Sequence, residues 1–295
     1  MVEKEEKELD FVLKLAKKVI GEHDIKLSEI ENIPLSKFPQ EFQKTVESRD
    51  MDDLGDIEPD DVRNLIIDTT AQAIKDKLRD RLEDVPYKVI PAGSTVYRIQ
   101  CTGYDSATFY GSGCDGRYNH HRGQTKIMYA AEKPDTCLAE LTERVDPEKG
   151  NGPHSRATEI SSDFFEEQDI GELKCQRNLE LVDISVMGTR LKLSGDLIDT
   201  HNYRNTQAVV AACEDLELTA DGFAYTGVHY QNGSAYALKE NINSPQLEMM
   251  SLTKLSDYQV DASLLPVSKF TRSRSSVSMV EVMERVLGGN VIPSE

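Results

Sequence analysis

The stretch GRYNHHRGQTKIMYAAEKPDTCLAEL, residues 116–141, decides how this chain is interpreted. Between Arg117 and Ala131 it contains no acidic residue, and its basic side chains surround His120 and His121. The apolar segment KIMYAAE then predicts a short β-strand. PDTCLAELTER begins with residues that favour the first turn of a helix, and this helix would carry Glu140. The stretch therefore combines a basic loop, a strand and a helix with one carboxylate near its buried side.

The rest of the chain is strongly acidic. Its 295 residues include 52 Asp and Glu against 34 Lys and Arg, a formal net charge of -18. In contrast, residues 85–131 hold five bases and only two acids. The net field disfavours sequence-independent binding to nucleic acid or to an anionic membrane, so we predict neither partner. A local basic segment still allows a small anion site.

Neither a disulfide framework nor a metal centre is predicted. The five cysteines are irregularly spaced and include no CxxC pair. Cys114 with His120 and His121 lacks the second half of a zinc site, and a loop histidine pair is more often solvated or hydrogen-bonded. The charged start MVEKEEKELD is unlike a secretory signal, and no apolar run approaches the roughly 18 residues of a membrane span. We expect a cytoplasmic protein, with delivery by a signal-independent secretion system left open.

Three regions are predicted from composition and periodicity. Residues 1–84 carry helical apolar stripes and read as a helical extension. Residues 85–265 mix strand and helix patterns without regular βαβ alternation, which indicates an α+β domain. Residues 266–295 read as a polar linker followed by a short helix and a tail.

The basic segment suggests a phosphate site. Arg98 lies in a strand pattern and Arg117 follows a glycine-rich loop, and guanidinium forks match phosphate oxygens. No Rossmann or P-loop motif is present. Ordinary salt bridges for the arginines, and a surface position for Glu140, are the plain alternatives. Together, one glutamate, two arginines and the nearby Tyr129 fit cleavage of the nicotinamide–ribose bond of NAD, because nicotinamide leaves neutral and needs no general acid.

Residues 98–238 resemble the RES domain, which is named for an arginine, a glutamate and a serine. The matching pieces are YRI (97–99), GSGCDGRYNHHRGQTKIMYAAEKPDTCLAEL (111–141), LELVDIS (179–185), TQAVVAAC (206–213) and DGFAYTGVHYQNGSAYAL (221–238). The order and spacing of Arg98, Arg117, Tyr129 and Glu140 carry most of the resemblance.

The resemblance implies an ADP-ribosyltransferase-like fold with a split β-sheet that holds NAD in a cleft. It implies that Arg98 and Arg117 bind the NAD phosphates, that Tyr129 lines the nicotinamide side and that Glu140 is the catalytic carboxylate. Tyr118 stands where the family usually has tryptophan. The family is best known as bacterial toxins that destroy NAD, many of them paired with an Xre-type antitoxin, so a proteinaceous antitoxin or immunity partner is implied as well.

The family serine is the main departure. It usually follows a Tyr-Pro pair after Asp-Gly, where this chain has Thr226 and Gly227. Thr226 and Ser234 are the candidates to supply the hydroxyl. Three functions follow: an NAD glycohydrolase or phosphorylase toxin, which we favour, an ADP-ribosyltransferase acting on a protein, and a catalytically inactive NAD-binding module. The acceptor (water, phosphate or protein), the cognate inhibitor, the oligomeric state and the role of residues 1–84 stay open.

Overall fold

A computed structural model describes residues 2–21, 25–51, 54, 56–113, 116–142, 159–191, 203–218, 221–226, 233–266 and 275–293. The chain divides into two compact units. The first comprises residues 1–83, 113–124 and 196–218, and the second comprises residues 84–112, 125–195 and 219–295. The boundaries predicted at 84/85 and 265/266 stay a prediction, and each unit is described by itself.

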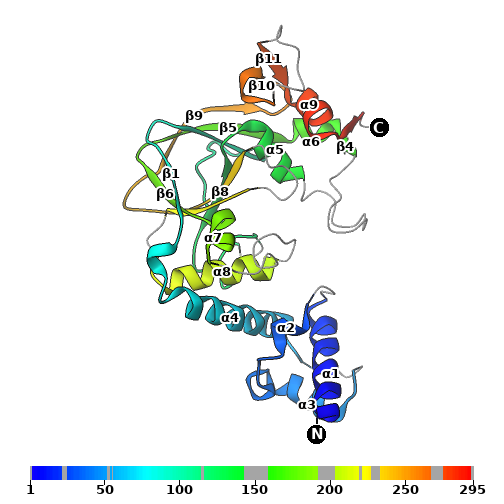
Figure 1. Cartoon of the computed structure of the whole chain (residues 1–295). Coiled ribbons are helices and arrows are strands. Elements are labelled where there is room, and N and C mark those ends of the chain that lie inside the picture. Colours follow the sequence, from blue (N-terminus) through cyan, green and yellow to red (C-terminus); the bar gives the residue numbers. More distant parts are fainter. Residues whose placement is uncertain are drawn as a thin grey trace. The chain divides into compact units, whose positions relative to one another are not determined.

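The first unit is helical (Figure 1). Its helices are α1 (Val2–Ile20), α2 (Leu27–Ile30), α3 (Gln40–Ser48), α4 (Pro59–Leu78) and α8 (Tyr203–Asp215), with a short 3-10 turn at Leu35–Lys37. Pro59 occupies the first turn of α4, where its missing N–H costs nothing. Apolar faces of α1 to α4 enclose one core around Leu15, Phe42 and Ile66, and α4 packs along α8.

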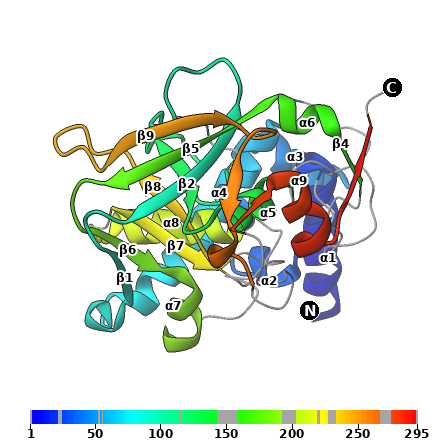
Figure 2. The same cartoon turned by 90° about the horizontal axis from the view of Figure 1, so that it is seen from above.

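The second unit is built on one eight-stranded sheet. In spatial order its strands are β1 (Tyr87–Ile90), β6 (Leu179–Asp183), β7 (Gly222–Thr226), β8 (Ser234–Lys239), β3 (Ile127–Ala131), β2 (Thr95–Cys101), β5 (Gln168–Cys175) and β9 (Leu247–Lys254). Within the described strands of this sheet, only the β6–β7 pair is parallel. Figure 2 shows β9, β5 and β2 running side by side. Mixed helices and strands without βαβ alternation confirm the α+β class.

This sheet is split between β3 and β2. The two strands share a single register pair, Tyr97 with Ala131, whereas β2 pairs with β5 over its whole length. The half formed by β1, β6, β7, β8 and β3 is strongly curled. A hydrogen bond shows this curl, since Lys88 on the edge strand β1 donates to Ser234 on β8, three positions away in strand order. The seam between β3 and β2 is therefore where the sheet opens.

One short helix covers the sheet at this seam. Helix α5 (Pro134–Thr142) contacts β2, β3 and β8. The remaining elements are α6 (Ser162–Glu166), α7 (Ile184–Leu191), α9 (Met279–Val282) continued by a π-helical turn (Met283–Leu287), β4 (Glu159–Ser161), β10 (Gln259–Asp261), β11 (Ser276–Ser278), β12 (Asn290–Ile292) and 3-10 turns at Leu82–Asp84 and Ala262–Leu264. Met279, Val282 and Leu287 are buried in the same core as Leu138 of α5.

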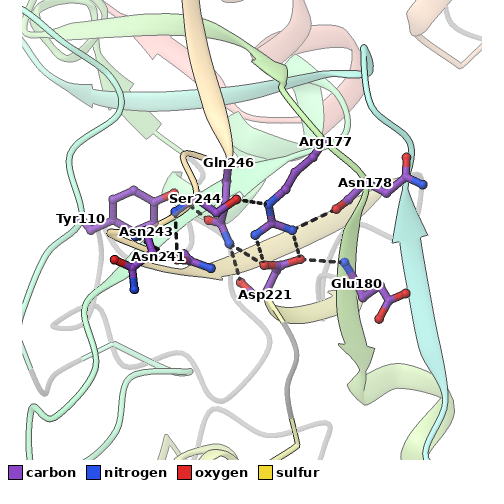
Figure 3. Close-up of polar contacts among 9 residues, drawn as sticks. All are labelled: Tyr110, Arg177, Asn178, Glu180, Asp221, Asn241, Asn243, Ser244 and Gln246. Atoms are coloured by element: carbon purple, nitrogen blue, oxygen red, sulfur yellow. Dashed lines mark hydrogen bonds and ion pairs between the residues drawn. The ribbon is translucent and has the colours of Figure 1, made fainter.

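The carboxylate of Asp221, just before β7, binds residues at or just before the starts of β6 and β9 (Figure 3). The Arg177 guanidinium donates two hydrogen bonds to it, one of them at 2.7 Å. The Glu180 backbone N–H donates at 3.0 Å and Gln246 Nε2 at 3.0 Å. Burial raises the pKa of Asp221, but these hydrogen bonds outweigh burial and hold the pKa below its ordinary value. Asp221 is thus a structural carboxylate with its oxygens already engaged.

The elements predicted from local patterns are found. The structure places strands at YRIQ, IMYAA, LELVD, GFAYT and SAYALK, and helices at residues 134–142 and 203–215. Several elements carried no clear pattern, notably β5, β9 and β12. The predicted turn at Asn232 lies outside the described residues. Among the described residues, no helix is long and apolar enough to cross a membrane.

Candidate functional site

A pocket opens in the second unit at the seam of the sheet, beneath α5. Its volume is about 370 Å³, including the part open to solvent. Its lining consists of Ile99, Tyr129, Ala130, Ala131, Cys137, Glu140, Leu141 and Tyr225. Among the described residues of this lining, Glu140 is the one acid, and the others are apolar or aromatic.

Strand register explains why the sheet is hollow here. Tyr225, Ala235, Ala131 and Tyr97 are successive partners across β7, β8, β3 and β2. Because partners in one row share a face of the sheet, two alanines lie between two tyrosines. The small alanine side chains leave a space between the two aromatic rings. In the neighbouring row, Ala237 separates Phe223 from Tyr129.

Close approach of α5 to the sheet brings Glu140 to this hollow. A β-carbon at Gly233 would lie 2.3 Å from Thr136 Oγ1, so only glycine allows the start of β8 so near the helix. Cys137 Sγ donates to the Tyr97 carbonyl oxygen at 3.5 Å and ties α5 to β2. One helical turn later, Oε1 of the Glu140 carboxylate is buried. The structure thus brings together Tyr129 and Glu140, the two predicted catalytic residues.

Arg98 points to the opposite face of the sheet. Successive residues of a strand alternate between faces, so Arg98 lies opposite Tyr97 and Ile99. Its Nη1 donates to the carbonyl oxygen of Ala107 at 3.0 Å and to that of Phe109. Burial lowers the pKa of Arg98, although a guanidinium remains protonated at neutral pH. Here Arg98 braces the loop after β2, and its role as a phosphate ligand stays a prediction.

Thr226 and Ser234 do not line the pocket. Thr226 Oγ1 accepts a hydrogen bond from Ser185 Oγ at 3.2 Å, at the start of α7. Ser234 Oγ accepts from Lys88 Nζ, and the Ser234 N–H donates to Glu132 at 3.3 Å. Both hydroxyls therefore bind other side chains, and neither is singled out as the family serine.

Arg117 and Tyr118 belong to the first unit, where both are buried. The Arg117 guanidinium carbon lies 5.5 Å from the centre of the Tyr203 ring, a cation–π distance. Thr206 Oγ1 donates to the Arg117 carbonyl oxygen at 2.7 Å. Arg117 is thus held by the start of α8.

His120 and His121 are also buried in the first unit, with their rings stacked 4.7 Å apart. His121 Nε2 lies 2.8 Å from Asp68 Oδ1, and His120 Nε2 lies 3.9 Å from Glu214 Oε2. Among the described residues, no three His, Cys, Asp or Glu side chains are grouped to hold a metal ion. Cys114 lies outside those residues.

The comparison with protein families matches residues 95–257 to the RES domain. The chain belongs to this family, as its motifs indicated. One similar solved structure is the crystal structure of the M. tuberculosis MbcT–MbcA toxin–antitoxin complex, at 18% identity and a TM-score of 0.45. The alignment covers 63% of this chain and 92% of that one. No curated protein matches.

Tyr225 is an aromatic pocket residue that sequence reasoning missed. It stands beside Thr226, which drew attention as a hydroxyl donor, and it faces Ala235 of β8. The sequence signal was the alternation in GFAYT, which places Phe223 and Tyr225 on one face. Which face holds the pocket depends on α5, and no local pattern specifies that.

Proposed function

We propose that this protein is a toxin that cleaves the nicotinamide–ribose bond of NAD and so depletes NAD in the cytoplasm. The observation that supports it best is the pocket at the sheet seam, where Glu140 lies with Tyr129 and Tyr225 and is the one acid that the described part of the lining contains. Membership of the RES family, to which NAD-degrading toxins belong, supports the substrate.

The chemistry needs only one carboxylate. The glycosidic bond from the anomeric carbon of the nicotinamide ribose (C1′, numbered 1″ in the product names) to the nicotinamide nitrogen breaks, and its electron pair neutralises the cationic ring as nicotinamide leaves. The ribose becomes oxocarbenium-like, and the negative charge of Glu140 stabilises it. Water or inorganic phosphate then bonds to C1′ and gives ADP-ribose, with loss of a proton, or ADP-ribose 1″-phosphate. In this proposal Tyr129 and Tyr225 pack the nicotinamide and ribose, and Arg117 binds the diphosphate end.

Nicotinamide release from NAD by the purified protein tests the proposal. The wild type is compared with Glu140→Gln, which keeps the shape of the side chain and removes its charge. Glu166→Gln is the control, because Glu166 is an exposed glutamate of α6 that pairs with Lys254 at 3.4 Å. We expect release by the wild type and by the control, and loss of at least about a hundredfold in Glu140→Gln.

The acceptor and the alternatives are separated by the products. Release that requires phosphate identifies a phosphorylase, and release without it identifies a glycohydrolase. Label from NAD that stays on a protein band identifies an ADP-ribosyltransferase instead. Binding of NAD by calorimetry with no nicotinamide released contradicts the proposal and favours an inactive binding module. We further propose a proteinaceous antitoxin that covers the pocket, tested by adding the candidate partner to the same assay.

A further inference from the structure

Helix α4 lies outside the RES match but shares a compact unit with residues that the match includes. The match spans residues 95–257, whereas α4 is Pro59–Leu78. The first unit nevertheless joins residues 1–83 with residues 113–124, which carry Arg117. Figure 1 shows α4 alongside α8 within this unit. The N-terminal helices therefore belong to the same compact unit as the loop of residues 116–122, which carries Arg117.

Asp68 of α4 holds the end of that loop. Its Oδ1 lies 2.8 Å from His121 Nε2, and its Oδ2 accepts a hydrogen bond from Arg122 Nη2 at 2.6 Å. His121 is buried and stacked on His120, whereas Asp68 is about half exposed. One carboxylate thus fixes two successive side chains, a buried imidazole and a surface guanidinium, through separate oxygens.

The beginning of the loop is held through α8. Gln207 Nε2 donates to the Gly116 carbonyl oxygen at 3.1 Å, and Arg63 of α4 donates to Gln207 Oε1 at 3.5 Å. Helix α4 therefore reaches both sides of Arg117, directly at residues 121 and 122 and through Gln207 at residue 116.

Further contacts keep α8 itself in place. The buried Arg204 of α8 has its Nε 3.4 Å from Glu29 Oε1 of α2. Burial lowers the pKa of Arg204 to about 10, which still leaves it charged at neutral pH. Lys75 of α4 pairs with Asp215 of α8 at 2.7 Å. The N-terminal helices thus support the loop and the helix that contacts it.

We propose that Asp68 is a positioning residue, through which the N-terminal helices hold residues 116–122 in the conformation that presents Arg117 to NAD. This inference rests on the proposed function for the identity of the ligand. The positioning itself concerns the loop alone, so it is tested separately from NAD cleavage.

Hydrogen–deuterium exchange of the full-length protein provides that separate test. Asp68→Ala removes both contacts, and Asp68→Asn keeps an acceptor for His121 without the charge that attracts Arg122. Asp76→Ala is the matched control on the same helix, where Asp76 accepts from Gln72 at 2.8 Å near the surface. We expect exchange in residues 116–122 to accelerate about three- to tenfold in Asp68→Ala, less in Asp68→Asn, and not in the control.

NAD kinetics provide the functional readout. In Asp68→Ala the KM for NAD should rise about three- to tenfold while kcat stays within about twofold, because a misplaced Arg117 weakens binding rather than chemistry. Asp68→Glu, which restores the charge, should recover part of the loss. Titration of NAD into Glu140→Gln with and without Asp68→Ala measures affinity without turnover.

The outcomes separate the two ideas. Unchanged exchange in residues 116–122, or a fall in kcat with KM unchanged, overturns the positioning role. Faster loop exchange in a protein whose wild type releases no nicotinamide overturns the proposed function and leaves the contact between α4 and the loop established.

Discussion

Glu140 and Asp221 are two carboxylates of the same unit with opposite surroundings. Asp221 receives hydrogen bonds from Arg177, Gln246 and the Glu180 backbone, which hold its pKa below the ordinary value. Glu140 lies in a pocket between tyrosines, on a helix brought close by Gly233. The comparison teaches that residue type alone does not distinguish a carboxylate held in a hydrogen-bond network from one that lines a pocket. The difference lies in the surroundings, which are a set of hydrogen-bond donors for Asp221 and a pocket with two tyrosines for Glu140.

The largest expected effect is on activity. Glu140→Gln should lower the rate of nicotinamide release about 10²- to 10³-fold, equivalent to about 3–4 kcal/mol of transition-state stabilisation. The melting temperature should change little, because no core packing is lost. The rate of nicotinamide release and the thermal unfolding of the same preparation check both predictions. Full activity in the variant would remove Glu140 from the mechanism.

Asp221→Ala should lower stability and leave activity nearly unchanged, the reverse of Glu140→Gln. It leaves Arg177 without its carboxylate and frees the ends of β6 and β7, so the free energy of unfolding should fall by about 2–3 kcal/mol. Activity per folded molecule should stay close to that of the wild type. Urea unfolding followed by circular dichroism measures the loss. A loss of activity without a loss of stability would break the comparison.

A smaller effect is expected at Tyr225. Tyr225→Leu should lower kcat/KM about tenfold, because the aromatic ring that lines the pocket beside Ala235 and Ala131 is removed. Tyr225→Phe keeps the ring and should lose less. Steady-state kinetics with both variants decide the point, and equal losses would assign the effect to the hydroxyl rather than to the ring.

The smallest effect is the dependence of stability on pH. Burial and the neighbouring His120 lower the pKa of His121 below its ordinary value of 6.5, against the opposing effect of Asp68. The folded state therefore prefers neutral His121, and stability should fall as pH drops below 6.5. Asp221 acts in a lower window, because its contribution is present above pH 3.8 and is lost as pH falls below that value.

Unfolding measured between pH 7 and 5 separates the two groups. His121→Gln should flatten the pH dependence over this range, and Asp221→Ala should leave its slope unchanged while lowering stability throughout. A slope that persists in His121→Gln would assign the titration to another group.

The sequence by itself determined the local elements and the family. Period-two alternation, an apolar run and a helix-start signal are local properties, so β2, β3, α5 and α8 could be predicted. The order of Arg98, Arg117, Tyr129 and Glu140 is likewise a linear feature, and it identified the RES family.

Only the tertiary structure decided which side chains share a site. Strand order and register are contacts between distant segments, so the row from Tyr225 through Ala235 and Ala131 to Tyr97 could not be foreseen. The face that α5 covers places Arg98 on the far side of the sheet from Glu140. Asp68 reaches His121 across 53 residues of sequence, because helix packing rather than any local pattern brings them together.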